Sequence, residues 1–181
     1  MQRIWRTLVA NLCLGVAVWA VPLAHADDDP ELELKAVFLG RFASYVQWPQ
    51  PQQAPVFQIT VVGAHPLDQR LTALYADKRI QGKPVRIYTV AQVQDIGTPQ
   101  LLFVALPTVA ARQAAIAYAQ SRGILTVSDS KGFAELGGVI QINFVAQNVQ
   151  IKINHEAAVK TGLHIGAPLL SIATVLRGDP P

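Results

Sequence analysis

The sequence predicts a single α/β domain with three layers, α/β/α, in which a mixed, mostly parallel sheet ends in an antiparallel hairpin. Short apolar segments typical of buried strands alternate with segments of helical periodicity between residues 56 and 129. Such alternation favours parallel pairing, because parallel neighbours need a long crossover connection. Two further apolar segments within 137–154 are separated only by a tight turn at Gln147-Asn148, which predicts the hairpin.

The N-terminal residues 1–26 are interpreted as a cleaved signal peptide, followed by an exported domain at 27–181. Arg3 and Arg6 precede the apolar segment 7–23, and the small residues of "AHA" end at Ala26. We therefore expect cleavage after Ala26 and a periplasmic protein. The alternative is an uncleaved inner-membrane anchor, since the apolar segment is nearly long enough to span a bilayer.

Composition excludes several classes of function for the exported chain. The chain of 181 residues less the 26 of the signal peptide leaves 155, enough for one domain. Its only cysteine, Cys13, lies in the signal peptide, so a disulfide, a thiolate nucleophile and a cysteine metal site are excluded. The 15 basic residues less Arg3 and Arg6 leave 13 against 12 acidic ones, which gives no support to nucleic-acid binding.

An amphipathic helix is expected over residues 32–47, ended by Trp48-Pro49. Its apolar residues recur at helical spacing. We interpret Phe38 and Phe42 as core, because such periodicity usually marks a buried face. The helix lies outside the alternation of strands, so its end is also a candidate partner interface, formed by Tyr45 and Trp48. For Trp48, core and interface stay equally open.

The remaining elements follow in order, with turn residues between them. Thr108 is the expected N-cap of one helix and Asn154 that of another, which Gly162 ends. Strands are predicted at 56–63, 83–90, 100–107 and 123–129, and helices at 66–76, 108–122, 155–161 and 168–176, with one helical turn at 131–136.

The segment 124–144 is the most site-like passage, but it fits no catalytic motif. A hydrolase based on Ser128 needs glycines two residues before and after the serine, and "TVSDS" has neither. Asp129 is interpreted instead as an N-cap or Asx turn for residues 130–135. The "HEAAV" stretch lacks the second histidine of a zinc helix, because Val159 stands there. No dinucleotide or phosphate-binding glycine motif is present, so we predict no catalytic residue, metal or cofactor.

A small-molecule site is a hypothesis from architecture alone. Open α/β sheets bind ligands at the carboxyl ends of their strands. His65, Ser128 and Asp129 belong to this edge of the predicted sheet. Further candidates are His164 and two cations that could hold an anionic ligand, Arg41 and Arg177.

Three passages, taken in order, resemble the YfiR family of periplasmic proteins. They are "LKAVFLGRFASYVQWP", "FQITVVGAHPLDQRLTAL" and the long segment from Ile124 to Ile165, and the likeness covers nearly all of 32–176. It implies a regulator rather than an enzyme. The best-known member restrains an inner-membrane diguanylate cyclase by binding its periplasmic sensor domain, and an outer-membrane lipoprotein relieves that restraint.

The resemblance also implies a homodimer, control of biofilm formation and motility through cyclic di-GMP, and a possible small aromatic or nucleotide-like ligand. The chain departs from the family in two respects. Better-studied members carry disulfides, which the exported chain lacks. Arg41 replaces a usual asparagine, and Gly166-Ala167-Pro168 replaces a Ser-Ser pair, so any contact made there has a changed specificity. Some members are modules of larger receptors, and a periplasmic ligand-binding module that signals to another membrane receptor is the alternative function.

Overall fold

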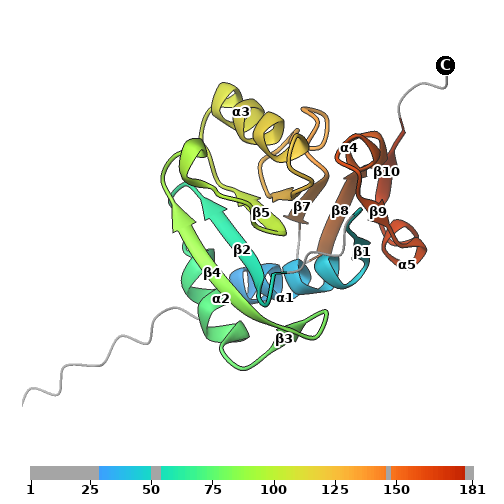
Figure 1. The fold of residues 1–181 in the computed structure, drawn as a ribbon. Helices are drawn as coiled ribbons and strands as arrows, with labels where there is room; N and C mark the ends of the chain where they lie inside the picture. The colour runs from blue at the N-terminus through green and yellow to red at the C-terminus, as the bar shows by residue number, and fades with distance from the viewer. Residues whose placement is uncertain (1–28, 50–53, 146–147, 178–181) are drawn as a thin grey trace, which may run out of the picture.

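The computed structural model describes residues 29–49, 54–145 and 148–177 and confirms the predicted three-layer architecture. Figure 1 shows a sheet between two helical layers, with α1 (Pro30–Ser44) and α2 (Leu67–Tyr75) on one face and α3 (Val109–Gln120) on the other. The predicted signal peptide, 1–26, lies outside the described residues. Among the residues that are described, no helix combines the length and the apolar character needed to cross a membrane.

The main sheet has the order β10-β8-β7-β6-β5-β2-β4-β3 within the described chain. Its centre is parallel, and an antiparallel pair stands at each side, β7 with β8 and β3 with β4. The strands are β2 (Phe57–Val62), β3 (Arg79–Ile80), β4 (Lys83–Val90), β5 (Leu101–Val104), β6 (Leu125–Ser128), β7 (Ile140–Val145), β8 (Asn148–Asn154) and β10 (Thr174–Leu176).

Alternate side chains of the central strands face two separate cores, as the pleat of a strand requires. On β5, Phe103 faces the core under α1 and α2, whereas Leu102 faces the core under α3. Phe42 and Leu39 bring α1 into the first core, and all four side chains are fully buried. The central strands β2, β5 and β6 are therefore covered on both faces, which explains why they read as continuous apolar segments.

The helix ends follow the predicted capping residues. Thr108 accepts a hydrogen bond from the amide of Ala111 at the start of α3, and Asn154 does the same for Ala157 in α4 (His155–Lys160). Gly162 follows α4 with φ of 77°, a left-handed conformation that favours glycine. The predicted hairpin is present, with Val145 paired to Asn148, although Gln147 itself lies outside the described residues.

Several short elements differ from the prediction. The first helix ends at Ser44, and Val46–Gln47 forms a small strand, β1, that pairs with β9 (His164–Ile165). The expected turn of helix at 131–136 is a series of hydrogen-bonded turns instead. The predicted last helix is only α5 (Ala167–Leu170), followed by β10. A 3-10 turn, η1 (Val93–Asp95), precedes β5. These pieces are too short to show a period in the sequence, and tertiary pairing defines them.

Candidate functional site

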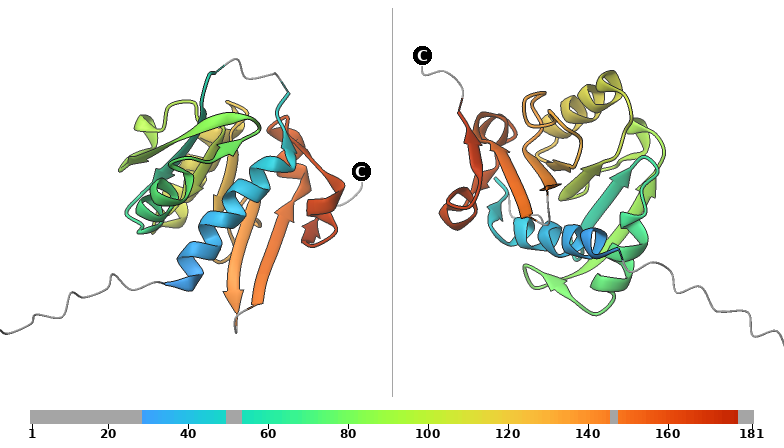
Figure 2. Two further views of the ribbon diagram at one scale, coloured as in Figure 1. Left: turned by 90° about the horizontal axis from the view of Figure 1, so that it is seen from below. Right: turned by 180° about the vertical axis from the view of Figure 1, so that it is seen from behind.

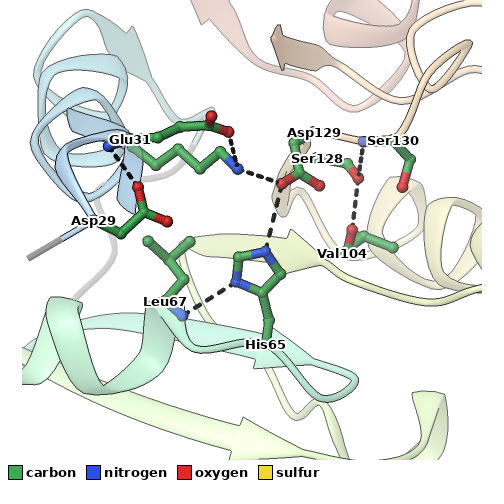
Figure 3. Close-up of polar contacts among 9 residues, drawn as sticks. Asp29, Glu31, His65, Leu67, Val104, Ser128, Asp129 and Ser130 are labelled. Carbon is green, nitrogen blue, oxygen red and sulfur yellow. Dashed lines mark hydrogen bonds and ion pairs between the residues drawn. The ribbon is translucent and has the colours of Figure 1, made fainter. Parts of the chain in front are cut away.

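The loops after β2 and β6 meet at the carboxyl edge of the sheet, because β5 alone separates the two strands. His65 follows β2 by three residues, and Asp129 is the first residue after β6. Figure 3 shows the Asp129 carboxylate reaching toward the His65 imidazole. The distance from His65 Nε2 to Asp129 Oδ2 is 3.4 Å. The architecture-based prediction that these loops converge is thus realised in the fold.

Lys35 completes this cluster from α1. Its Nζ lies 2.7 Å from Asp129 Oδ2 and 2.8 Å from Glu31 Oε1, and its side chain is only 8% exposed. The ammonium also lies 5.6 Å from the centre of the Phe144 ring. A buried cation is stable only when it is paired, and the two carboxylates satisfy that condition. We call Glu31, Lys35, His65 and Asp129 the edge cluster.

His65 is oriented by its own loop. Its Nδ1 accepts a hydrogen bond from the amide of Leu67 at 3.1 Å. In the neutral ring the proton therefore resides on Nε2, which faces Asp129. The imidazole edge packs on Phe103, with 5.1 Å between the ring centres. The ring is held on three sides and presents its proton to a carboxylate inside the protein.

The charges of the edge cluster stabilise one another. Burial alone would raise the pKa of Asp129, but its hydrogen bonds with His65 and Lys35 lower that pKa to about 2. Burial likewise opposes the charged form of Lys35, whereas its hydrogen bonds to Asp129 and Glu31 raise its pKa above the ordinary value. Both shifts keep the pair ionised, so the cluster is an internal ion pair at neutral pH.

Ser128 lies beneath the edge cluster and is fully buried. Its Oγ donates to the carbonyl of Val104 at 2.6 Å and accepts from the amide of Ser130 at 3.1 Å. The hydroxyl proton is thus committed to the neighbouring strand, which is the wrong arrangement for a nucleophile. The prediction that Asp129 caps the following turn is wrong, because Ser128 binds the Ser130 amide and the Asp129 carboxylate faces Lys35.

Arg41, His164 and Arg177 lie apart from the edge cluster. Arg41 is exposed near the end of α1, and exposed His164 pairs with Gln47 just beyond that end. The nine residues from Lys35 to Ser44 span about 14 Å of helix. Exposed Arg177 follows β10, at the far edge of the sheet. The structure thus brings His65, Ser128 and Asp129 together and leaves the other three predicted ligand residues elsewhere.

Lys35 is not among the site residues predicted from the sequence. A lysine in an amphipathic helix is normally solvated, and only the contact between α1 and the end of β6 shows its role. One signal was available, because Lys35 follows Glu31 by four residues, which is the spacing of a helical ion pair.

The two predicted interface residues face different surroundings. Tyr45 is 44% exposed. Trp48 is half-buried and packs edge-on against Phe57, with 5.7 Å between the ring centres. Trp48 is therefore anchored to the first core, whereas Tyr45 is available at the surface.

A second polar feature is a groove between α1 and α2 with a volume of about 360 Å³. Arg41, Lys78 and Arg79 line it together with apolar side chains that include Val37 and Leu74. The two helices approach closely because Gly40 has no side chain, since a Cβ there would lie 1.9 Å from the hydroxyl of Tyr75. We call this feature the basic groove.

A metal centre finds no support in the described part of the chain, where no group of three or more histidine, cysteine, aspartate or glutamate residues could hold an ion. The edge cluster has two carboxylates, but Lys35 occupies the position between them. Its chemistry is that of a structural ion pair with a partly exposed rim.

Comparison with solved structures supports the fold. A conserved domain protein from Vibrio cholerae matches with a TM-score of 0.58 and 17% identity over 81% of this chain and 60% of the other. The ABC domain in complex with L-Trp from Streptococcus pneumonia matches with a TM-score of 0.54 and 11% identity over 80% of this chain. The chain spans 60% of the length of each of these two proteins. At these identities the likeness shows the fold alone.

A search of curated proteins found no match. The model of one protein family, described as YfiR/HmsC-like, matches residues 32–174. This range includes α1 from Leu32 onward, the edge cluster except Glu31, and the hairpin. It confirms the resemblance noted in the three sequence passages. The chain therefore belongs to the YfiR/HmsC-like family of periplasmic regulators of cyclic di-GMP signalling.

Proposed function

We propose that this protein binds the periplasmic sensor domain of an inner-membrane diguanylate cyclase and represses the enzyme. Repression lowers cytoplasmic cyclic di-GMP and so controls biofilm formation and motility. The observation that carries this proposal is the family match over 32–174, which covers most of the chain. An outer-membrane lipoprotein is the proposed source of relief, as in the family member that the sequence resembles.

The geometry of the edge cluster supports a binding role rather than a catalytic one. Its charged groups are paired with one another, and Ser128 beneath them gives its proton to a backbone carbonyl. No described group there is both activated and open to a substrate. A regulator that acts through its surface needs only a stable scaffold, which this ion pair provides.

We propose that the partner surface includes Tyr45 and the rim of Trp48, at the end of α1. Aromatic residues at a surface supply large contact areas at low entropic cost and are enriched in interfaces. Tyr45, which directly follows α1, is 44% exposed and is one of the large apolar side chains that the described chain leaves at its surface.

Deletion of the gene tests the proposal directly. We expect cellular cyclic di-GMP to rise and the wild-type chain to restore it, whereas Tyr45→Ala restores it poorly. Tyr88→Ala is the matched control, because Tyr88 is exposed to a similar extent, 48% against 44%. Unchanged cyclic di-GMP after deletion, together with no co-purification of a cyclase ectodomain, would reject the cyclase as partner.

The alternative function is a small-ligand module that signals to another membrane receptor. It is favoured by the fold likeness to a domain described with bound L-Trp, and by the partly exposed rim of His65 and Asp129 at the edge where α/β sheets bind ligands. In this reading Arg41, His164 and Arg177 are candidates for separate contacts. A rise in melting temperature with aromatic amino acids or nucleotides, lost in His65→Ala, would support it. An unchanged melting temperature with both aromatic amino acids and nucleotides would reject this alternative function.

A further inference from the structure

The outer edge of β8 is only partly covered by its neighbour β10. The two strands pair in parallel, beginning with Thr174 opposite Lys152, although β8 itself begins at Asn148. Within the described chain, residues 148–151 therefore have no strand beside them on that side. Figure 2 (left) shows the β7–β8 hairpin projecting past the C-terminal elements, which are drawn in red. We call residues 148–151 the open edge.

The chain before β10 turns away instead of extending that strand along the open edge. The helix α5 ends at Leu170, and residues 171–173 form a turn in which the amide of Ala173 donates to the carbonyl of Leu170 at 3.4 Å. A groove of about 530 Å³ lies where a longer β10 would run, lined by residues 149–152, Asn143 and residues 171–174. Four residues of strand span about 13 Å, so the open edge accommodates a short extended segment.

The backbone of Val149 faces this groove. At the other end of β8, the amide of Asn154 donates to the carbonyl of Val139, on the β7 side, at 2.9 Å. Residues of an antiparallel pair face the neighbouring strand alternately, so every second residue from Asn148 to Asn154 faces β7 and the residues between them face away. The N–H and C=O of Val149 and the N–H of Ile151 therefore point to the side where β10 is absent. Another extended backbone satisfies such alternating groups.

The open edge lacks the features that protect free strand edges in natural proteins, which are charged residues and proline. The opposite side of the sheet follows this rule, because β4 carries Lys83, Pro84 and Arg86. Residues 148–151 and 171–176 contain neither a charged residue nor a proline, and Ile172 is 64% exposed there. An edge of this composition is open to pairing with another chain.

We propose that the open edge binds an extended, uncharged segment of a partner protein as an additional strand, in line with β10. The side chain of Val149 packs against the first core, whereas Asn143 and Gln150, which pair in register, line the groove on the other face of the sheet. A bound strand alternates in the same way, so it places an apolar side chain beside Val149 and a neutral polar one beside the two amides.

An uncharged segment fits the groove better than an acidic one does. Lys152 is the only cation among the residues that line the groove, and it is already paired with Glu135. Backbone hydrogen bonds thus supply the affinity, and the alternating side chains supply the selectivity. This site goes beyond the proposed cyclase surface, because it is formed by the hairpin and the turn before β10, and a defined peptide tests it without any cyclase.

Amide hydrogen exchange measured by NMR tests the open edge. In the free protein the amide of Val149 should exchange rapidly, and that of Gln150, which faces β7, slowly. The probe is an acetylated pentapeptide amide in which Thr and Val alternate. At about ten times its dissociation constant, this peptide should slow exchange of the Val149 amide about 10-fold. The same peptide N-methylated at each residue has no backbone donors and should leave the exchange unchanged.

Two substitutions at Val149 provide a matched pair. Val149→Pro removes the outward N–H but no hydrogen bond to β7, and edge strands accept proline at such positions. This variant should fold and bind the peptide with a dissociation constant at least about 10-fold higher, as expected for a lost hydrogen bond. Val149→Ala truncates the same side chain but keeps the N–H, so its dissociation constant should stay within about 3-fold of wild type.

The outcomes either establish the strand-binding site or overturn it. Slowed exchange at Val149 and Ile151 that is lost in Val149→Pro and kept in Val149→Ala establishes it. Unchanged exchange at about 5 mM peptide, where even a millimolar complex is mostly formed, overturns it. Equal slowing along the outer edge of β4, or a Val149 amide already protected in the free protein, also overturns it. If Val149→Pro fails to fold, the N-methylated peptide decides the case.

Discussion

The inward and outward faces of α1 each carry a cation. The two cations differ in burial and in whether a carboxylate pairs with them. Lys35 points inward, is 8% exposed and lies within 2.8 Å of two carboxylates. Arg41 points outward, is exposed and contacts no described acidic residue. The comparison shows that the buried cation is paired within the domain, whereas the exposed cation on the same helix has no described acidic partner.

The difference follows from desolvation. A charge removed from water must be paired within the same chain, because an unpaired buried charge costs several kcal/mol. An exposed charge remains hydrated and tolerates the absence of a partner until one arrives. Four predictions test this division between the faces, in decreasing order of expected effect.

Replacing the inward cation should have the largest effect on stability. Lys35→Ala leaves Asp129 without its closest cation, and we expect the free energy of unfolding to fall by about 3 kcal/mol. Arg41→Ala is the matched control and should change it by less than about 0.5 kcal/mol in the monomer. Urea denaturation at low protein concentration measures both. Equal losses in the free energy of unfolding for the two variants would show that the two faces of α1 do not differ in their contribution to stability.

Acid should weaken the domain through Asp129. The pKa of this carboxyl is about 2 in the folded chain, below its ordinary value of 3.8, so the folded state binds the proton less readily than the unfolded state. The stabilisation is present above about pH 4 and is lost as the pH falls toward 2, by about 2 kcal/mol. Unfolding measured across this range should show the loss in wild type and a smaller one in Lys35→Ala. An Asp129→Asn variant with the full acid dependence would assign it to other carboxyls.

The two aromatic residues at the end of α1 should separate folding from binding. Trp48→Ala removes a half-buried ring packed on Phe57, and we expect a loss of close to 2 kcal/mol, somewhat less than for a fully buried aromatic. Tyr45→Ala should stay within about 0.5 kcal/mol of wild type. Thermal and urea unfolding compare the two. A large loss for Tyr45→Ala would place it in the core of the monomer rather than at a partner surface.

The smallest effect concerns the hydroxyl beneath the edge cluster. Ser128→Ala removes the hydrogen bond to the Val104 carbonyl and should cost about 1 kcal/mol. Cyclic di-GMP levels in cells carrying the variant should match wild type. Loss of regulation by a chain that folds normally would instead give Ser128 a direct functional role.

Much of the edge cluster could be anticipated from the sequence. His65 and Asp129 each follow an apolar strand, and the rule for ligand sites in open sheets places both at one edge. Lys35 could not be anticipated, since its partner Asp129 is 94 residues away in the sequence. The aromatic periodicity of the first helix correctly placed Phe42 in the core. It also included Leu34 and Tyr45, which the structure leaves exposed, because α1 is apolar on two faces and periodicity cannot separate them.

The sequence by itself determined the alternation of strands and helices, the caps at Thr108 and Asn154, the hairpin and the family, because these depend on residues that are neighbours in the chain. Only the tertiary structure decided which charges are paired and which are open. Pairing across the sheet joins segments far apart in the sequence, and burial depends on which face of α1 the sheet covers. For this reason Lys35 and Arg41, six residues apart on one helix, have different roles that the sequence could not distinguish.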